Sequence, residues 1–190
     1  MEFGYVIDHI GERRHDRFAV VIFLPPPLEQ IIAPLREKYD PIYNLVGAHV
    51  SLVFPFDARM SLDELVGAIR AEVEHRKAFR IELSSIGDFY PGDPVIYWQA
   101  KNSSHLTDLH FNLHIRLGLA VPHKVFQPHV TVAREISHHR VPLVKDKIAG
   151  WLPDEHFVAD RIDLITPVTG NKWVSVRTFR LKEDPGAIRS

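Results

Sequence analysis

Two short motifs in the chain place a hydroxyl residue two positions after a histidine. The first motif, His-Val-Ser-Leu, occupies residues 49–52, and the second, His-Val-Thr-Val, occupies residues 129–132. Side chains alternate along a β-strand, so the histidine and the hydroxyl of each motif would share one face, about 6.6 Å apart along the backbone. This spacing suits an imidazole beside a scissile oxygen and a hydroxyl beside a nonbridging oxygen of the same phosphate.

The residue types fit the cleavage or transfer of a phosphodiester. His49 and His129 have an unperturbed pKa near 6.5, so one can accept a proton while the other supplies one. Ser51 and Thr131 would donate hydrogen bonds to phosphate oxygens whose charge grows in the transition state. Arg134, five residues after His129, could add a bidentate cationic contact. These residues predict acid–base chemistry, and they leave open which histidine is the acid.

The pairing of the motifs matters more than either motif alone. A single His-x-Ser/Thr on a strand is usually a half-buried histidine bonded to a neighbour. Two copies at positions 49 and 129, on matching strands of an apparent internal repeat, favour a functional interpretation. For Arg134, a solvated arginine at a strand end fits the spacing as well as a phosphate ligand does.

Hydrophobic patterns predict the elements that must position the motifs. Apolar runs predict strands over residues 18–24, 48–54, 79–86, 95–101, 129–134, 157–165 and 173–181. Helical spacing of apolar residues predicts helices over residues 28–39, 61–75, 104–117 and 142–150. We expect Pro34 to kink or break the first helix and Pro55 to end a strand, whereas Ser61-Leu-Asp-Glu64 predicts a capping box.

The same order of elements occurs twice, which predicts an internal repeat. With an offset of 80 residues, the helix at 28–39 falls near the helix at 104–117. The chain of 190 residues suits one domain or two small lobes that share a core. We expect an N-terminal arm over residues 1–17 and a single bilobal catalytic domain over residues 18–190. Its two repeats would span roughly 18–90 and 94–182.

Composition narrows the class of partner. The net charge is −1, with 23 basic against 24 acidic residues, and proteins that grip a long duplex usually show a basic excess. There is no cysteine, which removes disulfides and thiolate chemistry. The apolar run from Phe18 to Leu24 is too short to span a bilayer, and no secretory signal is recognisable. A cytoplasmic monomer without membrane association is therefore expected.

The paired motifs resemble those of the 2H phosphoesterases. Residues 48–56, Ala-His-Val-Ser-Leu-Val-Phe-Pro-Phe, and residues 126–134, Phe-Gln-Pro-His-Val-Thr-Val-Ala-Arg, are similar to the 2′-5′ RNA ligase-like (LigT-like) branch. The resemblance covers most of residues 18–181, although the first motif has serine where threonine is commoner. It implies an α+β fold, bilobal and pseudo-symmetric, with two antiparallel sheets facing each other across a central cleft and helices outside.

The resemblance also implies an activity and a set of site residues. The activity would be hydrolysis of 2′,3′-cyclic phosphate ends of RNA or of small cyclic nucleotides to 2′-phosphates, or reversible 2′-5′ RNA ligation, in RNA processing and without a cofactor. His49 and His129 would be catalytic, and Ser51 and Thr131 would hold the phosphate. Arg134 matches a frequent basic position of this branch.

Three aromatic residues are candidates for stacking on a base: Phe54, Phe56 and Tyr90. Core packing is the alternative role for each of them.

Two other interpretations compete with this one. His110 and His114 lie at i and i+4 on a predicted helix near His105, which could suggest a zinc site. The pair lacks the glutamate of His-Glu-x-x-His and lies off the leucine stripe, so a solvated helix face is the expected explanation. The other alternative is a non-catalytic RNA- or nucleotide-binding module that retains the fold.

Overall fold

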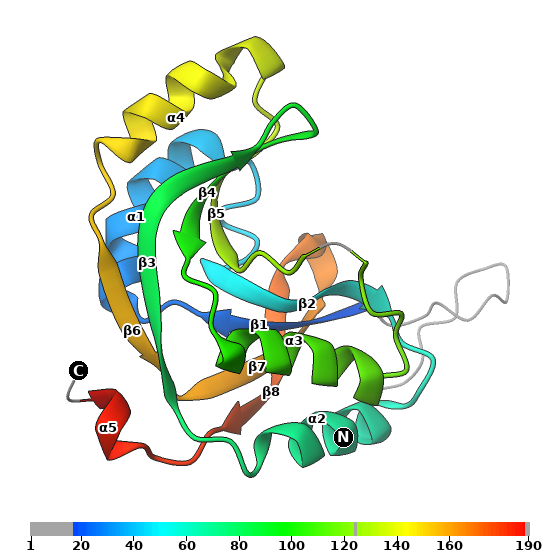
Figure 1. Cartoon of the computed structure of the whole chain (residues 1–190). Helices are drawn as coiled ribbons and strands as arrows, with labels where there is room; N and C mark the ends of the chain where they lie inside the picture. The colour runs from blue at the N-terminus through cyan, green and yellow to red at the C-terminus, as the bar shows by residue number, and fades with distance from the viewer. Residues whose placement is uncertain (1–16, 124, 189–190) are drawn as a thin grey trace, which may run out of the picture.

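The computed structural model describes residues 17–123 and 125–188. In this part of the chain, eight antiparallel strands form one curled sheet with helices packed on its outer face (Figure 1). The strands are β1 (Arg17–Phe23), β2 (His49–Asp57), β3 (Phe79–Phe89), β4 (Asp93–Ala100), β5 (His129–Ala133), β6 (Glu155–Ala159), β7 (Arg161–Pro167) and β8 (Trp173–Arg180). The helices are α1 (Pro26–Tyr39), α2 (Leu62–Val73), α3 (Ser104–Arg116), α4 (Val141–Ala149) and the short α5 (Pro185–Ile188), with 3₁₀ turns η1 (His138–Arg140) and η2 (Thr169–Asn171). Apart from Arg17, the expected N-terminal arm lies outside the described residues.

The sheet consists of two four-stranded halves. The strand order is β6-β3-β4-β5-β2-β1-β7-β8, and the halves meet where β5 pairs with β2. The expected bilobal α+β architecture with helices outside is confirmed, and the two expected antiparallel sheets are the two halves of one curled sheet. The halves are continuous with each other, because Val50 pairs with Val130 at their junction.

The two halves of the sheet exchange strands. The order β1-α1-β2-α2-β3 is followed by β4-α3-β5-α4 and the last three strands. β3 does not pair with β1 or β2; it inserts between β4 and β6 in the other half. In the same way β7 leaves the half that contains β6: it pairs with β1 on one side and with β8, which moves with it, on the other. Each half therefore contains a central strand from the other end of the chain.

Local sequence explains how α1 and α2 begin. Helix α1 starts at Pro26 with prolines at its first positions, where the missing N–H groups would have no helical partner. Of the two outcomes expected at Pro34, a kink or a break, the break does not occur, because α1 runs on through Pro34 to Tyr39. Helix α2 starts with the predicted capping box between Ser61 and Glu64.

Two predicted strand boundaries were wrong. β2 continues through Pro55 to Asp57, because β1 pairs with it as far as Asp57. On its other side β2 pairs with β5 only at Val50, so the missing N–H of Pro55 breaks no hydrogen bond to β5. The predicted strand 157–165 is two strands separated at Asp160. β6 pairs with β3 and β7 pairs with β1, so the chain passes here from one half of the sheet to the other.

The main core lies between the outer face of the sheet and the helices. Its members include Val50 and Val130 at the junction and Leu106, Leu109 and Leu113 of α3, all fully buried. The aliphatic positions of both motifs therefore anchor β2 and β5 in the core. Their histidines and hydroxyls must point to the opposite, inner face of the sheet.

Candidate active site

The two motifs meet at the junction of the sheet. Because Val50 and Val130 are antiparallel partners, the register sets His49 across from Thr131 and Ser51 across from His129. All four side chains are partly exposed, whereas both valines are fully buried. The structure thus brings the four predicted residues together on one face.

Both imidazoles are held in the same way by the backbone. His49 Nδ1 lies 2.7 Å from the carbonyl oxygen of Gly47, and His129 Nδ1 lies 2.8 Å from that of Gln127. A carbonyl only accepts, so Nδ1 of each ring must carry the proton and donate it. In the neutral form this leaves Nε2 of each histidine as a free acceptor. The equivalent bonds give the site a two-fold backbone pattern.

The pKa values of both histidines are depressed. The pKa of His49 is lowered from 6.5 to about 4, mainly by burial. The positive charges of Arg36 and Arg134 and the neighbouring His129 contribute to this shift, whereas the hydrogen bond to Gly47 opposes it. Burial also lowers the pKa of His129, with a contribution from Arg134. Both rings are therefore neutral at pH 7 in the free protein. Arg134 is close enough for its charge to act on both of them.

The surroundings of the two histidines differ. The His49 ring contacts Phe23 edge-on, with centroids 6.1 Å apart. The His129 ring packs against both Phe89 and Tyr97, at centroid distances of 5.1 and 5.0 Å, and these two rings also contact each other at 4.5 Å. The backbone pattern is symmetric, but the second motif has the tighter aromatic enclosure.

A polar network braces the enclosure around His129. The amide of Gln127 donates to the Tyr97 hydroxyl and to Gln99 Oε1, the latter at 3.0 Å. The main-chain carbonyl of the same Gln127 accepts from His129. Gly87 lies opposite Tyr97 on β3, and a Cβ at that position would overlap the tyrosine ring. The absence of a side chain at Gly87 therefore leaves room for the Tyr97 ring, which contacts His129.

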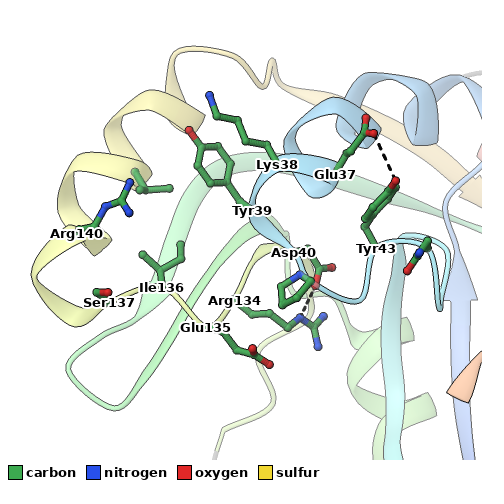
Figure 2. A pocket seen from close by; sticks show the side chains of 13 residues that line it. Glu37, Lys38, Tyr39, Asp40, Tyr43, Arg134, Glu135, Ile136, Ser137 and Arg140 are labelled. Atoms are coloured by element: carbon green, nitrogen blue, oxygen red, sulfur yellow. Dashed lines mark hydrogen bonds and ion pairs between the residues drawn. The ribbon is translucent and has the colours of Figure 1, made fainter.

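Arg134 is fixed by a buried carboxylate. Its Nε lies 2.8 Å from Oδ1 of Asp40, whose side chain has no exposed surface (Figure 2). Oδ2 of Asp40 accepts from Nε and Nη2 of Arg36 at 3.2 and 3.0 Å. The backbone N–H of Arg134 also donates to the carbonyl of Tyr39, the last residue of α1. One buried carboxylate thus holds two arginines and fixes the position of the Arg134 guanidinium.

The same ion cluster supports the segment that leads into the first motif. Arg36 Nη2 donates to the carbonyl of Val46 at 2.9 Å. Glu29, 3.5 Å from Arg36, accepts from the backbone N–H of Ala48 at 2.8 Å. These bonds lie on either side of Gly47, whose carbonyl orients His49.

A pocket of about 490 Å³ adjoins this cluster. It lies between the end of α1 with the turn after it and the segment that follows β5 (Figure 2). Arg134 lines the pocket, and the two histidines do not.

Comparison with known proteins identifies the family. Residues 24–171, well over half of the chain, match the 2′-5′ RNA ligase superfamily. The chain belongs to this superfamily. A protein of Geobacillus kaustophilus named "Putative phosphoesterase" is 27% identical over 166 residues, which are 86% of this chain and 95% of that protein. A Bacillus licheniformis protein with the same description is 29% identical over 87% of this chain and 98% of its own length.

Solved structures agree on the fold. The structure of Escherichia coli LigT complexed with 3′-AMP superposes with a TM-score of 0.63 at 17% identity, covering 87% of this chain and 98% of LigT. At this identity the likeness shows the fold alone. Together with the superfamily match, it supports the expected resemblance to the LigT-like branch of the 2H phosphoesterases.

The three candidate base-stacking residues are scattered within this superfamily fold. Phe54 is exposed, and Phe56 is partly buried against Phe18 with ring centroids 6.4 Å apart. Tyr90 is exposed in the turn between β3 and β4, where it contacts the ring of His138 at 6.0 Å. None of the three lines the pocket beside Arg134.

The histidine pair on α3 is not on a solvated face, contrary to the sequence-based expectation. His110 and His114 are buried, and their Nδ1 atoms bond to the carbonyls of Leu52 and His110. The His110 ring stacks on Phe126 with ring centroids 4.0 Å apart. Its hydrogen bond to Leu52 attaches α3 to β2 behind the first motif. In the described residues, no group of three or more histidine or acidic side chains is arranged to hold a metal. None of the described helices has the length and apolar character needed to cross a bilayer.

Sequence reasoning missed the residues that support the site. Asp40 was absent from the candidates, although Arg36 and Asp40 are spaced i and i+4 at the end of a helix, which is the spacing of an intrahelical ion pair. Gln127 had a usable signal, because it stands two residues before His129 as Gly47 does before His49. Tyr97 had no comparable signal, because its place depends on strand pairing.

Proposed function

We propose that the chain is a metal-independent phosphoesterase acting on 2′,3′-cyclic phosphates, at the end of an RNA or on a small nucleotide. The observation that carries the proposal is the Val50–Val130 pairing, which aligns two histidines and two hydroxyls on one face. Each imidazole is bonded to the backbone at Nδ1, and among the described residues neither has a bond at Nε2. Arg134 supplies a fixed positive charge beside both rings.

In the proposed reaction, water attacks the phosphorus of the cyclic phosphate. Nε2 of one histidine takes the proton from water as the new P–O bond forms, and Nε2 of the other gives a proton to the ribose 3′-oxygen as its bond to phosphorus breaks. The products are a 2′-phosphate and a free 3′-hydroxyl. If a 5′-hydroxyl of RNA replaces water, the same transfers give a 2′-5′ linkage.

Substrate binding allows one of the two histidines to be protonated, as the general acid must be. In the free protein both pKa values are below 6.5, so both histidines act as bases at neutral pH. A bound phosphate brings negative charge close to the rings and raises the pKa of an adjacent imidazole. Ser51, Thr131 and Arg134 would meanwhile hold the nonbridging oxygens, whose charge increases in the transition state.

Structures of relatives support a nucleotide as the substrate class. Solved structures of E. coli LigT contain 3′-AMP, ATP and NADP⁺. These ligands belong to LigT, but the shared fold makes a nucleotide the first choice for this chain. The near-neutral net charge also suits a small substrate or an RNA end better than a long duplex.

The test is turnover of nucleoside 2′,3′-cyclic phosphates and of short RNAs with a cyclic phosphate end, in the presence of EDTA. His49→Ala and His129→Ala should each lower kcat by about 10²–10⁴-fold. His75→Ala is the matched control, because His75 is exposed just after α2 and outside the site. Full activity of His129→Ala, or loss of activity in EDTA, would overturn the proposal. Tight binding without turnover would instead identify a non-catalytic binding module.

A further inference from the structure

The pocket beside Arg134 extends the proposed phosphate site in one direction. Its walls come from Tyr39 and the following turn on one side and from the segment 135–140 on the other. A volume of about 490 Å³ lies within the range of small-molecule sites. Arg134 stands at the boundary: it lines the pocket, and through Asp40 it belongs to the ion cluster that holds the segment before His49. A molecule whose phosphate binds at the histidines can therefore place a neighbouring group in this pocket.

The lining of the pocket favours a neutral, flat group over a second phosphate. Three cations, Lys38, Arg134 and Arg140, are matched by three carboxylates, Glu37, Asp40 and Glu135. A second anion would meet this balanced lining with no excess of positive charge.

Two tyrosines supply the aromatic surface of the pocket, beside the aliphatic side chains of Pro41, Ile136 and Val144. Tyr43 is 37% exposed, and its hydroxyl is 3.4 Å from Glu37, which holds the ring at the pocket wall. The Tyr39 ring carries the Lys38 ammonium 5.1 Å from its centroid. Asn44 and Ser137 add hydrogen-bonding groups at the edge. Aromatic rings beside amide and hydroxyl groups are the usual surroundings of a bound nucleobase.

The wall formed after β5 contains an uncommon backbone conformation. Glu135 has φ of 58°, in the left-handed region that non-glycine residues seldom adopt. Glu135 directly follows Arg134. The chain therefore turns between Arg134, beside the proposed phosphate site, and Ile136 and Ser137, which line the pocket. Such outliers often mark functional positions.

We propose that this pocket is the specificity subsite for the nucleobase of the substrate, with Tyr43 and Asn44 as its principal contacts. The inference rests on the proposed function, because it assigns the group attached to the phosphate. It differs from the expectation that Phe54, Phe56 or Tyr90 stacks on the base.

The test compares two substrates that share the reacting group. One is a nucleoside 2′,3′-cyclic phosphate, and the other is 1-O-methylribose 2′,3′-cyclic phosphate, which lacks the base. Tyr43→Ala and Asn44→Ala should raise KM for the nucleoside substrate, by about 10-fold for the tyrosine, and leave kcat/KM for the base-free substrate unchanged. Ser137→Trp, which fills the pocket from its exposed rim, should act in the same direction. Phe54→Ala and Tyr90→Ala are the matched controls with exposed aromatics outside the pocket.

The outcomes separate the subsite from the function. The subsite is wrong if the Tyr43 and Asn44 variants leave KM for the nucleoside substrate unchanged, or if Phe54→Ala or Tyr90→Ala raises this KM instead. In either case, histidine-dependent turnover of the base-free substrate still upholds the proposed function. If the unmodified protein turns over neither substrate, the proposed function itself fails. Thermal unfolding of each variant shows whether an effect on KM reflects a folded protein.

Discussion

Val50 on β2 and Val130 on β5 form the one register pair between the two motif strands in the described residues. This antiparallel pair crosses the motifs, so that each imidazole lies opposite the hydroxyl residue of the other motif. A phosphate between the histidines would therefore be held by both halves of the sheet at once. Neither motif presents a complete site by itself.

The hydroxyls of Ser51 and Thr131 should be needed for turnover. Ser51→Ala and Thr131→Val each remove one donor to a charged oxygen, a loss of about 1.5–3 kcal/mol that corresponds to roughly 10–100-fold in kcat. Steady-state kinetics on a nucleoside cyclic phosphate measures this. Thr107→Ala is the control, because Thr107 binds Asn102 on the surface of α3. Wild-type kcat in both motif variants would remove the hydroxyls from the mechanism.

The pH dependence should reflect the depressed histidine pKa values. Acid–base catalysis needs one neutral and one protonated ring, so kcat/KM should be bell-shaped, and both limbs belong to the coupled pair. Because burial and Arg134 lower both pKa values, the optimum should lie below pH 6.5. Arg134→Ala removes positive charge, raises both pKa values and should move the profile to higher pH. Arg134→Lys keeps the charge and should leave the limbs in place; a profile that Arg134→Ala does not shift would contradict this account.

Asp40 should act as a positioning residue for Arg134. Asp40→Asn keeps the size of the buried side chain but removes the charge that fixes Arg36 and Arg134. We expect lower kcat/KM together with a loss of about 3–5 kcal/mol in the free energy of unfolding, the scale for breaking a buried ion pair. Kinetics and denaturant unfolding measure the two effects.

A control separates positioning by Asp40 from stability alone. Glu72 is a second buried carboxylate, bound by Arg76 and Arg116 between α2 and α3. Glu72→Gln should destabilise the fold without changing kcat. In an Arg134→Ala background, Asp40→Asn should cause little further loss of kcat/KM, because the residue it positions is gone. Fully additive losses would show that Asp40 acts on activity by another route.

Gly87 should be required for the enclosure of His129. An alanine Cβ at this position would overlap the Tyr97 ring, so Gly87→Ala should displace Tyr97, lower kcat and destabilise the fold by about 1–3 kcal/mol. Gly67→Ala provides the contrast, since a Cβ on this α2 residue meets no heavy atom within 4 Å. It should stabilise the helix by about 0.5–1 kcal/mol without effect on kcat. Equal behaviour of the two variants, by kinetics and thermal unfolding, would count against the role of Tyr97.

Local patterns predicted the parts of this molecule that depend on local physics. Alternation on a strand was sufficient to assign the faces of the two motifs, and the capping box at Ser61 located the start of α2. The His110–His114 pair was misjudged because helical spacing defines one apolar stripe, whereas α3 is also buried against β2 through the bond from His110 to Leu52. That second buried face depends on a contact 58 residues away.

The supporting residues of the site depend on such distant contacts throughout. Asp40 reaches Arg134 only because α1 packs beside the end of β5, and Tyr97 reaches His129 only because β4 pairs with β5. A single sequence carries no local sign of either pairing. The split of the predicted strand 157–165 at Asp160 has the same cause, because each piece follows a different partner.

The exchange of β3 and β7 between the halves of the sheet has a consequence for how the chain can be divided. A fragment ending at the turn near Pro91 would contain β3 with none of its partners, and the complementary fragment would contain β6 with none of its own. Separately expressed, each piece would present unpaired strand edges and a broken core. Mixed together, they should reassemble into an active enzyme, so this turn is a natural point for a split-protein reporter.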